Sequence, residues 1–362
     1  MARELGLGGT ERQLAETALS LDRARFTPHV GCFRPGGFRE AELRAAGVPV
    51  VNLDVTSLLS ARLLAGVRRL GCYLETQQIR LVHTFDVPLD LFGVPVARLF
   101  RVPVVLSSQR AHRALTPGLT RHLLRLTDRI ADGIVVNSQS VARELLAQDG
   151  VPASQIHLAY NGIDTSIFRP EGPAAERPWH DAIIIGVVCA LRPEKGLPLL
   201  IEAFAHVRRA HAEARLLIVG SGPAQAELES LAAELGVDND CRFVGAAKHV
   251  ADWLRAMDIF VLPSLSEALS NSLMEAMACG CCAVASDAGG NPELVRDSVS
   301  GLLFPVGNAA ALAGRLRRLL GNPEERRRMA DNGARFMREN FNRERAARRM
   351  GEIYAGFLEG VK

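Results

Sequence analysis

The stretch IFVLPSLSEALSNSLMEAMACG, residues 259–280, decides the fold of this chain. Its first five residues are an apolar run typical of a short buried strand, and residues 271–279 have the pattern of a helix. Glu267 then lies on the loop at the carboxyl end of the strand, and Glu275 lies about one turn inside the helix. In open parallel sheets, ligands bind in the crevice outside these strand ends.

The two glutamates have the chemistry to hold a sugar nucleotide at such an edge. A loop carboxylate accepts hydrogen bonds from sugar hydroxyls, and a helix carboxylate can accept both hydroxyls of a ribose. Backbone N–H groups at the start of the helix, around Asn271 and Ser272, suit a diphosphate. Two glutamates at this spacing also occur by chance, so the pair gains its meaning from the sequence around it.

Apolar strand-like runs alternate with amphipathic helical stretches along the whole chain. Residues 81–85 and 183–189 are among the predicted strands, and residues 199–209 and 309–320 are among the predicted helices. This alternation predicts an α/β fold with parallel sheets covered by helices on both faces.

The length of 362 residues favours two domains over one. Residues 168–181 are the segment most typical of a linker, because they are rich in Pro, Gly and Ala and have no periodicity. We therefore expect a first domain over residues 1–168 and a second over residues 169–342. Residues 343–358 have the pattern of a further amphipathic helix.

The composition excludes several classes of protein. Hydrophobic residues make up 48% and charged residues 23%, which is ordinary for a globular enzyme. The net charge of +3 is too small to indicate nucleic acid as a partner. No run approaches the about 20 apolar residues of a membrane span, and no signal-peptide pattern precedes the first motif, so we expect a cytoplasmic protein. The seven Cys include one cluster, Cys279, Cys281 and Cys282, but it has no second Cys pair or His nearby in sequence, which predicts reduced thiols and no zinc site.

The sequence resembles the retaining glycosyltransferases of family four, whose hallmark is a Glu, seven residues, and a second Glu in the following helix. Further segments match the family in order from residue 6 to about residue 305. They are Gly8-Gly9-Thr10-Glu11, Asn161-Gly162-Ile163-Asp164, Leu191-Arg192-Pro193-Glu194-Lys195-Gly196, Val219-Gly220-Ser221-Gly222-Pro223 and Gly289-Gly290-Asn291-Pro292-Glu293.

The resemblance implies two Rossmann-like domains facing across a cleft, the GT-B architecture, with the C-terminal helix over residues 343–362 crossing back to the first domain. It implies a nucleotide-diphospho-sugar as donor, with no essential metal and no cofactor. Catalysis falls to Arg192 and Lys195, which would hold the diphosphate, and to Glu267, which would hold the sugar.

Donor binding is further assigned to five residues on the same resemblance. Glu275 would hold the ribose, and Asn271 and Ser272 would place backbone N–H groups at the diphosphate. Gly8 and Gly9 would let the backbone of the first domain approach the same phosphates.

The acceptor side departs from the family. Many relatives carry a His just after the strand that corresponds to residues 102–107, where this chain has Ser108-Gln109-Arg110. We name His83, Gln109 and Arg110 as candidate acceptor-side residues, although a lone His at a strand end is more often a hydrogen-bonded structural residue.

Three readings of the function stay open at this point. The first is a hexosyltransferase that acts on a glycan or a lipid-linked acceptor. The second is a sugar-nucleotide epimerase of the same architecture, and the third is a catalytically silent subunit that binds nucleotide-sugars.

Two segments give further expectations. Residues 110–129 combine Arg with Leu at helical spacing, which predicts either a helix on an anionic membrane surface or a helix that buries its leucines on the first domain's sheet. The chain also begins directly before its glycine loop, where a doubly wound domain has a central strand. We therefore expect that strand to be missing here and the natural protein to be longer.

Overall fold

The computed structural model describes residues 1–6, 8–34, 36–60 and 62–360. The chain divides into two compact units, one made of Met1–Gly162 with Arg343–Lys362 and the other of Ile163–Asn342. The division falls after Gly162, earlier than the expected residue 168. The reason is that Ile163 pairs with Asn342 in an isolated bridge and donates its N–H to the Phe341 carbonyl at 2.9 Å.

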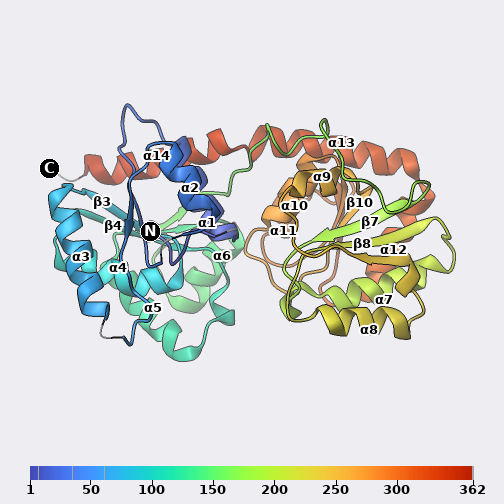
Figure 1. The fold of residues 1–362 in the computed structure, drawn as a ribbon, viewed down its shortest axis with the longest axis horizontal. Helices are drawn as coiled ribbons and strands as arrows, with labels where there is room; N and C mark the ends of the chain where they lie inside the picture. The colour runs from blue at the N-terminus through green and yellow to red at the C-terminus, as the bar shows by residue number, and fades with distance from the viewer. Residues whose placement is uncertain (7, 35, 61, 361–362) are drawn as a thin grey trace. The chain divides into compact units, whose positions relative to one another are not determined.

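The second unit, all of whose residues are described, is built on one parallel sheet (Figure 1). Its strands run in the spatial order β12-β11-β10-β7-β8-β9. The chain passes from β7 to β8 and β9 on one side, then returns to form β10 on the other side of β7. The strand order therefore reverses between β7 and β10. The bounds are Ile183–Val188 (β7), Ala214–Val219 (β8), Cys241–Phe243 (β9), Ile259–Leu262 (β10), Cys282–Ser286 (β11) and Gly301–Phe304 (β12).

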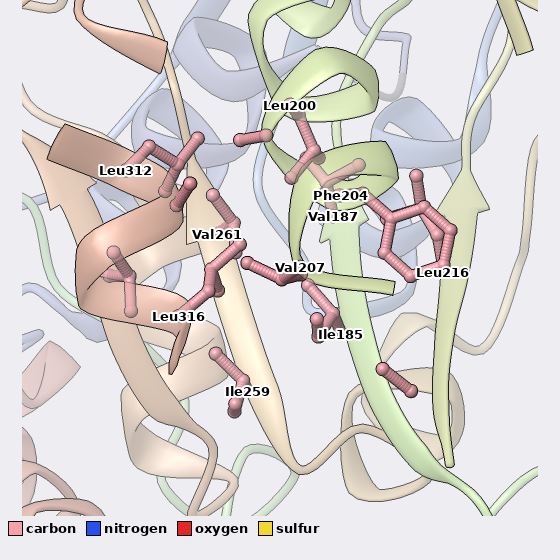
Figure 2. Packing of buried hydrophobic residues seen from close by; sticks show 14 of the residues in the cluster. Ile185, Val187, Leu200, Phe204, Val207, Leu216, Ile259, Val261, Leu312 and Leu316 are labelled. Carbon is pink, nitrogen blue, oxygen red and sulfur yellow. The ribbon is translucent and has the colours of Figure 1, made fainter. Parts of the chain in front are cut away.

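Helices cover both faces of this sheet, which is why β7 and β10 are almost entirely apolar. Figure 2 shows Leu200 and Phe204 of α7 and Leu312 and Leu316 of α12 packed over the strands. This packing fixes the strand ends from which the site loops start. The helices of the unit are α7 (Leu197–Arg208), α8 (Gln225–Glu234), α9 (Val250–Arg255), α10 (Asn271–Ala278), α11 (Asn291–Leu294), α12 (Ala309–Gly321) and α13 (Pro323–Asn340), with the 3-10 turns η4 (Pro193–Lys195) and η5 (Asp238–Asp240).

The described part of the first unit holds two parallel sheets, with the orders β1-β2 and β3-β4-β5-β6. The strands are β1 (Val30–Cys32), β2 (Val50–Asn52), β3 (Leu81–Thr84), β4 (Val104–Gln109), β5 (Gly133–Val136) and β6 (Ile156–Leu158). The helices are α1 (Gly9–Ser20), α2 (Phe38–Ala45), α3 (Arg62–Thr76), α4 (Val87–Leu99), α5 (Gly118–Ile130), α6 (Gln139–Glu144) and α14 (Arg343–Glu359), with the shorter turns η1 (Arg113–Leu115), η2 (Leu145–Asp149) and η3 (Ala153–Gln155).

Residues 1–3 lie between these two sheets and pair with both. Ala2 forms a parallel bridge with Cys32 and donates its N–H to the Gly31 carbonyl at 3.1 Å. On the other side, Phe85 donates its N–H to the Met1 carbonyl at 2.9 Å. We expected the central strand of this domain to be missing. At the strand ends that residues 1–3 reach, that expectation was wrong.

The C-terminal helix α14 belongs to the first unit, where it packs against α1. Its Met350, Ile353 and Tyr354 join the buried cluster that includes Val104 and Leu106 of β4. The two units together confirm the predicted α/β class with parallel sheets.

Candidate donor and acceptor sites

The candidate donor site lies in the second unit at the carboxyl ends of β7 and β10. These two strands are neighbours, with Ile259 opposite Ile185 in the parallel register. The strand order reverses between them, and this is the place where doubly wound sheets bind ligands. The loop after β7 carries Arg192 and Lys195, and the loop after β10 carries Glu267.

A tight turn after β7 brings Lys195 to the end of β10. Gly196 ends the 3-10 turn η4 with φ of 64°, a left-handed conformation that favours glycine. A Cβ at residue 196 would lie 2.2 Å from the Pro263 carbonyl oxygen, so the two loops approach too closely for any other residue. Leu265 also donates its N–H to the Glu194 carbonyl at 2.9 Å.

The turn after β8 supports the same segment from its other side. Leu191 donates its N–H to the Ser221 carbonyl at 3.0 Å. A Cβ at Gly222 would lie 2.4 Å from the Leu191 carbonyl oxygen, and one at Gly220 would lie 1.8 Å from the Cys189 carbonyl oxygen. The two glycines therefore let the β8 turn pack directly on the backbone that leads to Arg192.

Lys195 and Glu267 form an ion pair through Lys195 Nζ and Glu267 Oε1. The same carboxylate oxygen accepts a hydrogen bond from Ser264 Oγ at 3.0 Å. The side chains of Lys195 and Glu267 are 23% and 10% exposed, whereas Arg192 is 63% exposed and its Nη1 lies 3.9 Å from Glu194 Oε1. The structure thus brings together three predicted residues at one edge, with one cation paired and the other open to solvent.

The sequence interpretation missed Ser264. It is fully buried, and its carbonyl oxygen accepts a hydrogen bond from Ser286 Oγ of β11 at 2.6 Å. Its place two residues after the end of β10 and three residues before Glu267 was the available signal, because a hydroxyl there can reach the following loop.

Helix α10 begins where the sequence predicted. Ser270 caps it, because its Oγ accepts the N–H of Leu273 at 3.3 Å. Asn271 and Ser272 form its first turn and are half-buried, and Glu275 lies further along the helix with 2% of its surface exposed. The positive end of the helix dipole therefore lies on the same side of the sheet as the Glu267 loop.

Cys189 lies near the same charged groups at the end of β7. Burial raises the pKa of this thiol to about 12, despite the nearby Lys195 ammonium. At neutral pH it is therefore a neutral thiol that adds no charge to the site. The described residues contain no group of three His, Cys, Asp or Glu side chains placed to hold a metal ion.

Gly8 and Gly9 lie in the first unit, at the start of α1. Gly8 is the residue before the helix, and a Cβ there would lie 2.1 Å from Glu11 Oε2. Burial raises the pKa of Glu11 above its usual value. A larger residue at position 8 would therefore displace the flexible end of the Glu11 side chain and no backbone atom.

His83 has the hydrogen-bonded structural role that the sequence offered as the alternative to an acceptor contact. Its Nδ1 pairs with Tyr354 Oη at 2.7 Å and its Nε2 pairs with Ser108 Oγ at 2.7 Å. Burial holds the pKa of His83 well below its usual value, so the ring is neutral. Both nitrogens thus bind residues of the first unit itself, as the structural alternative for His83 expected.

Gln109 is also held inside the first unit. Its amide nitrogen donates to the Ala111 carbonyl at 2.5 Å, and its amide oxygen accepts from Arg113 Nε at 2.8 Å. Arg113 in turn forms a bidentate pair with Asp128 at 2.6 and 2.9 Å. The structure therefore gives Gln109 a buried bracing role, and its contact with an acceptor stays a prediction.

Arg110 is the remaining acceptor-side candidate. Its Nη2 donates to Asn161 Oδ1, and its guanidinium lies 5.3 Å from the centre of the Phe85 ring. Burial lowers the pKa of Arg110 to about 10, which still leaves it positively charged at neutral pH. It is a half-buried cation just beyond the carboxyl end of β4.

None of the helices in the described part of the chain combines the length and apolar character that crossing a bilayer requires.

Comparison with known proteins agrees with this geometry. Residues 169–336 match the family "Glycosyl transferases group 1", and residues 7–167 match "Glycosyltransferase Family 4". A D-inositol 3-phosphate glycosyltransferase of Streptomyces bingchenggensis is 34% identical over 248 residues, which cover 64% of this chain and 54% of that protein. A protein of the same name from Thermobispora bispora is 31% identical over 324 residues, 82% of this chain and 75% of that protein.

The solved structure of Anabaena HepE in complex with UDP has a TM-score of 0.84 to this chain, with 98% of each chain covered and 21% identity. At that identity the likeness shows the fold alone. This chain spans about half the length of the first relative and three quarters of the second. On the two family matches and these relatives, the chain belongs to the group 1 glycosyltransferases, also called glycosyltransferase family 4.

Proposed function

We propose that this protein is a retaining glycosyltransferase that moves a hexose-type sugar from a nucleotide-diphospho-sugar to a hydroxyl of a glycan or lipid-linked acceptor. The observation that carries the proposal is the Lys195–Glu267 pair beside Arg192, at the strand ends where the sheet order reverses. One edge of the sheet therefore offers cations for a leaving diphosphate and a carboxylate for sugar hydroxyls.

In this mechanism, Arg192 and Lys195 stabilise the negative charge that grows on the diphosphate as the bond from the sugar C1 to the phosphate oxygen breaks. Glu267 accepts hydrogen bonds from the sugar hydroxyls, and Glu275 accepts those of the ribose. The acceptor oxygen forms the new bond to C1 on the face that the phosphate leaves, and its proton passes to the departing phosphate oxygen.

The proposed reaction needs no metal, because the two cations and the start of α10 supply the positive charge that a metal would otherwise bring. The expected result is full activity of the wild-type protein in EDTA. Loss of activity in EDTA, with recovery on adding magnesium, would contradict this part of the proposal.

A donor panel tests the function itself. HepE binds UDP, which makes UDP-sugars the first donors to try, and the names of the relatives make inositol phosphate an acceptor to try beside lipid-linked saccharides. We expect slow hydrolysis of the correct donor without acceptor, and a product whose anomeric configuration by NMR matches that of the donor. A product of inverted configuration would exclude the retaining mechanism. Interconversion of two sugar nucleotides would favour an epimerase, and donor binding without turnover would favour a silent subunit.

We further propose that helix α5 docks on an anionic membrane surface. Four apolar side chains recur on it at helical spacing and are 41–76% exposed: Leu119, Leu123, Leu126 and Ile130. They therefore do not pack on the first domain's sheet, which was the alternative expectation for this segment. Leu124 of the same helix, by contrast, is buried. Apolar exposure on one face, bordered by cations, fits a bilayer surface whose lipid-linked acceptor would lie close by.

Flotation with anionic liposomes tests this partner. Arg121 and Arg125 form ion pairs with Asp149 at 3.0 and 2.9 Å. Replacing these arginines by Glu would therefore disturb the structure as well as the surface charge. A double variant at two exposed leucines, Leu119→Asn with Leu126→Asn, avoids this problem. It should abolish flotation without changing the melting temperature. Leu235→Asn, at an exposed leucine of the second unit, is the control. A wild-type protein that ignores anionic liposomes at low salt would exclude the membrane.

A further inference from the structure

Hydrogen bonds from neighbouring residues hold Glu267 of the Lys195–Glu267 ion pair in place. Glu267 Oε1 receives both the Lys195 ammonium and the hydroxyl of the fully buried Ser264. The backbone at Glu267 is fixed as well, because its carbonyl oxygen accepts the N–H of Gly290 at 3.2 Å. This carboxylate therefore has a set position and the ammonium as its counter-ion.

This pairing sets up a competition for Lys195. A diphosphate that arrives at the site attracts the ammonium away from Glu267, and the carboxylate also repels the new negative charge. Glu267 is only 10% exposed, so water cannot fully replace a lost cation. Leaving a poorly solvated charge without its partner is costly.

An intact nucleotide-sugar resolves the competition, whereas a free nucleoside diphosphate does not. The hydroxyls of the bound sugar can donate hydrogen bonds to Glu267 and replace the ammonium as it moves to the phosphates. The nucleoside diphosphate left after transfer has no sugar, so it must compete with Glu267 for Lys195. Re-forming the ion pair then favours departure of this product.

We propose that the Lys195–Glu267 ion pair distinguishes the intact sugar nucleotide from the nucleoside diphosphate product and promotes release of that product. This inference rests on the proposed function, and it adds to Glu267 a second role beyond sugar binding.

Arg192 has no such role in this scheme. Its side chain is 63% exposed, and its nearest ion-pair partner, Glu194, is itself 37% exposed and 3.9 Å away. A loosely paired, well-solvated cation attracts intact donor and product alike. Glu194 is therefore a matched control for Glu267, because it is a carboxylate on the same edge that pairs with the other cation.

Binding measurements by calorimetry test the proposal on the whole protein. UDP, GDP, ADP and dTDP and their glucose conjugates are titrated into wild type, Glu267→Gln and Glu194→Gln. We expect Glu267→Gln to bind the preferred nucleoside diphosphate about three- to tenfold more tightly, as for a partly buried charge pair. The preference for the sugar nucleotide over the nucleoside diphosphate should shrink in Glu267→Gln and persist in Glu194→Gln.

A double-mutant cycle shows whether the effect passes through Lys195. In a Lys195→Gln background, adding Glu267→Gln should no longer tighten nucleoside diphosphate binding, provided that thermal melting confirms a folded protein. A gain that survives without Lys195 would mean general repulsion and would overturn the inference. So would unchanged or weaker nucleoside diphosphate binding by Glu267→Gln. If the wild type binds none of the nucleotides or sugar nucleotides, the proposed function itself fails.

Discussion

At the scale of single residues, Glu275 offers a direct test of the donor site. It is almost completely buried on α10, the helix that follows the Glu267 loop. Glu275→Gln keeps the shape of the side chain and removes the charge from the hydrogen bonds that we propose it makes to the ribose, a class of interaction worth roughly 1.5–3 kcal/mol. We expect donor affinity in calorimetry to fall about tenfold or more, with little change in the KM for acceptor. Unchanged donor affinity would remove Glu275 from the site.

Arg192 separates a role in transfer from a role in folding. Its side chain is mostly in solvent and its nearest ion-pair contact is loose, so Arg192→Ala should leave the melting temperature unchanged. Turnover should nevertheless fall about 10²–10³-fold, because the lost charge matters most as the diphosphate leaves. Arg242→Ala, at an exposed Arg of β9, is the control. Equal kcat in the two variants would argue against the catalytic assignment of Arg192.

At the scale of secondary-structure elements, the turn after β8 supports the backbone that leads to Arg192 through two glycines, Gly220 and Gly222. A methyl group at Gly222 would meet the Leu191 backbone at 2.4 Å, so Gly222→Ala must push the two turns apart. We expect a loss of roughly 1–3 kcal/mol in the free energy of unfolding, together with weaker donor binding. Gly314→Ala, on α12 with open space around its Cβ, should instead stabilise by up to about 1 kcal/mol. Chemical denaturation of both variants tests the contrast, and similar stabilities would refute it.

At the scale of the whole molecule, His83 links parts of the chain that are far apart in sequence. It joins β3 to β4 through Ser108 and to α14 through Tyr354, which is 271 positions away. Because burial lowers its pKa in the folded state, the unfolded chain binds a proton more readily below the ordinary value near 6.5. This contribution to stability is therefore present above pH 6.5 and is lost as the pH falls below it.

Hydrogen exchange of the β3 and α14 peptides measures this effect, since both Trp residues, Trp179 and Trp253, lie in the other unit. Stability of the first unit should fall by up to about 1.4 kcal/mol per pH unit below pH 6.5. The slope should be smaller in His83→Gln and unchanged in His122→Gln, an exposed His of the same unit. Identical pH profiles of wild type and His83→Gln would show that His83 does not govern this dependence.

The sequence by itself determined the α/β class and the edge on which Arg192, Lys195 and Glu267 lie. Apolar runs and helical spacing are local properties, and loops that follow parallel strands necessarily meet at one edge of the sheet. The same local signals predicted the start of α10 at Asn271. A match of motifs in order then pointed to the family.

Only the tertiary structure decided how these side chains are paired. Glu267 is bound by Lys195, 72 positions away, and His83 is bound by Tyr354, so both side chains are already paired within their own units. Arg121 and Arg125, which border the apolar face of α5, are likewise both paired with Asp149, a contact that helical spacing did not predict. Local sequence patterns carry no information on such contacts, because distant charges and hydrogen-bonding groups meet only after the strands and helices have packed.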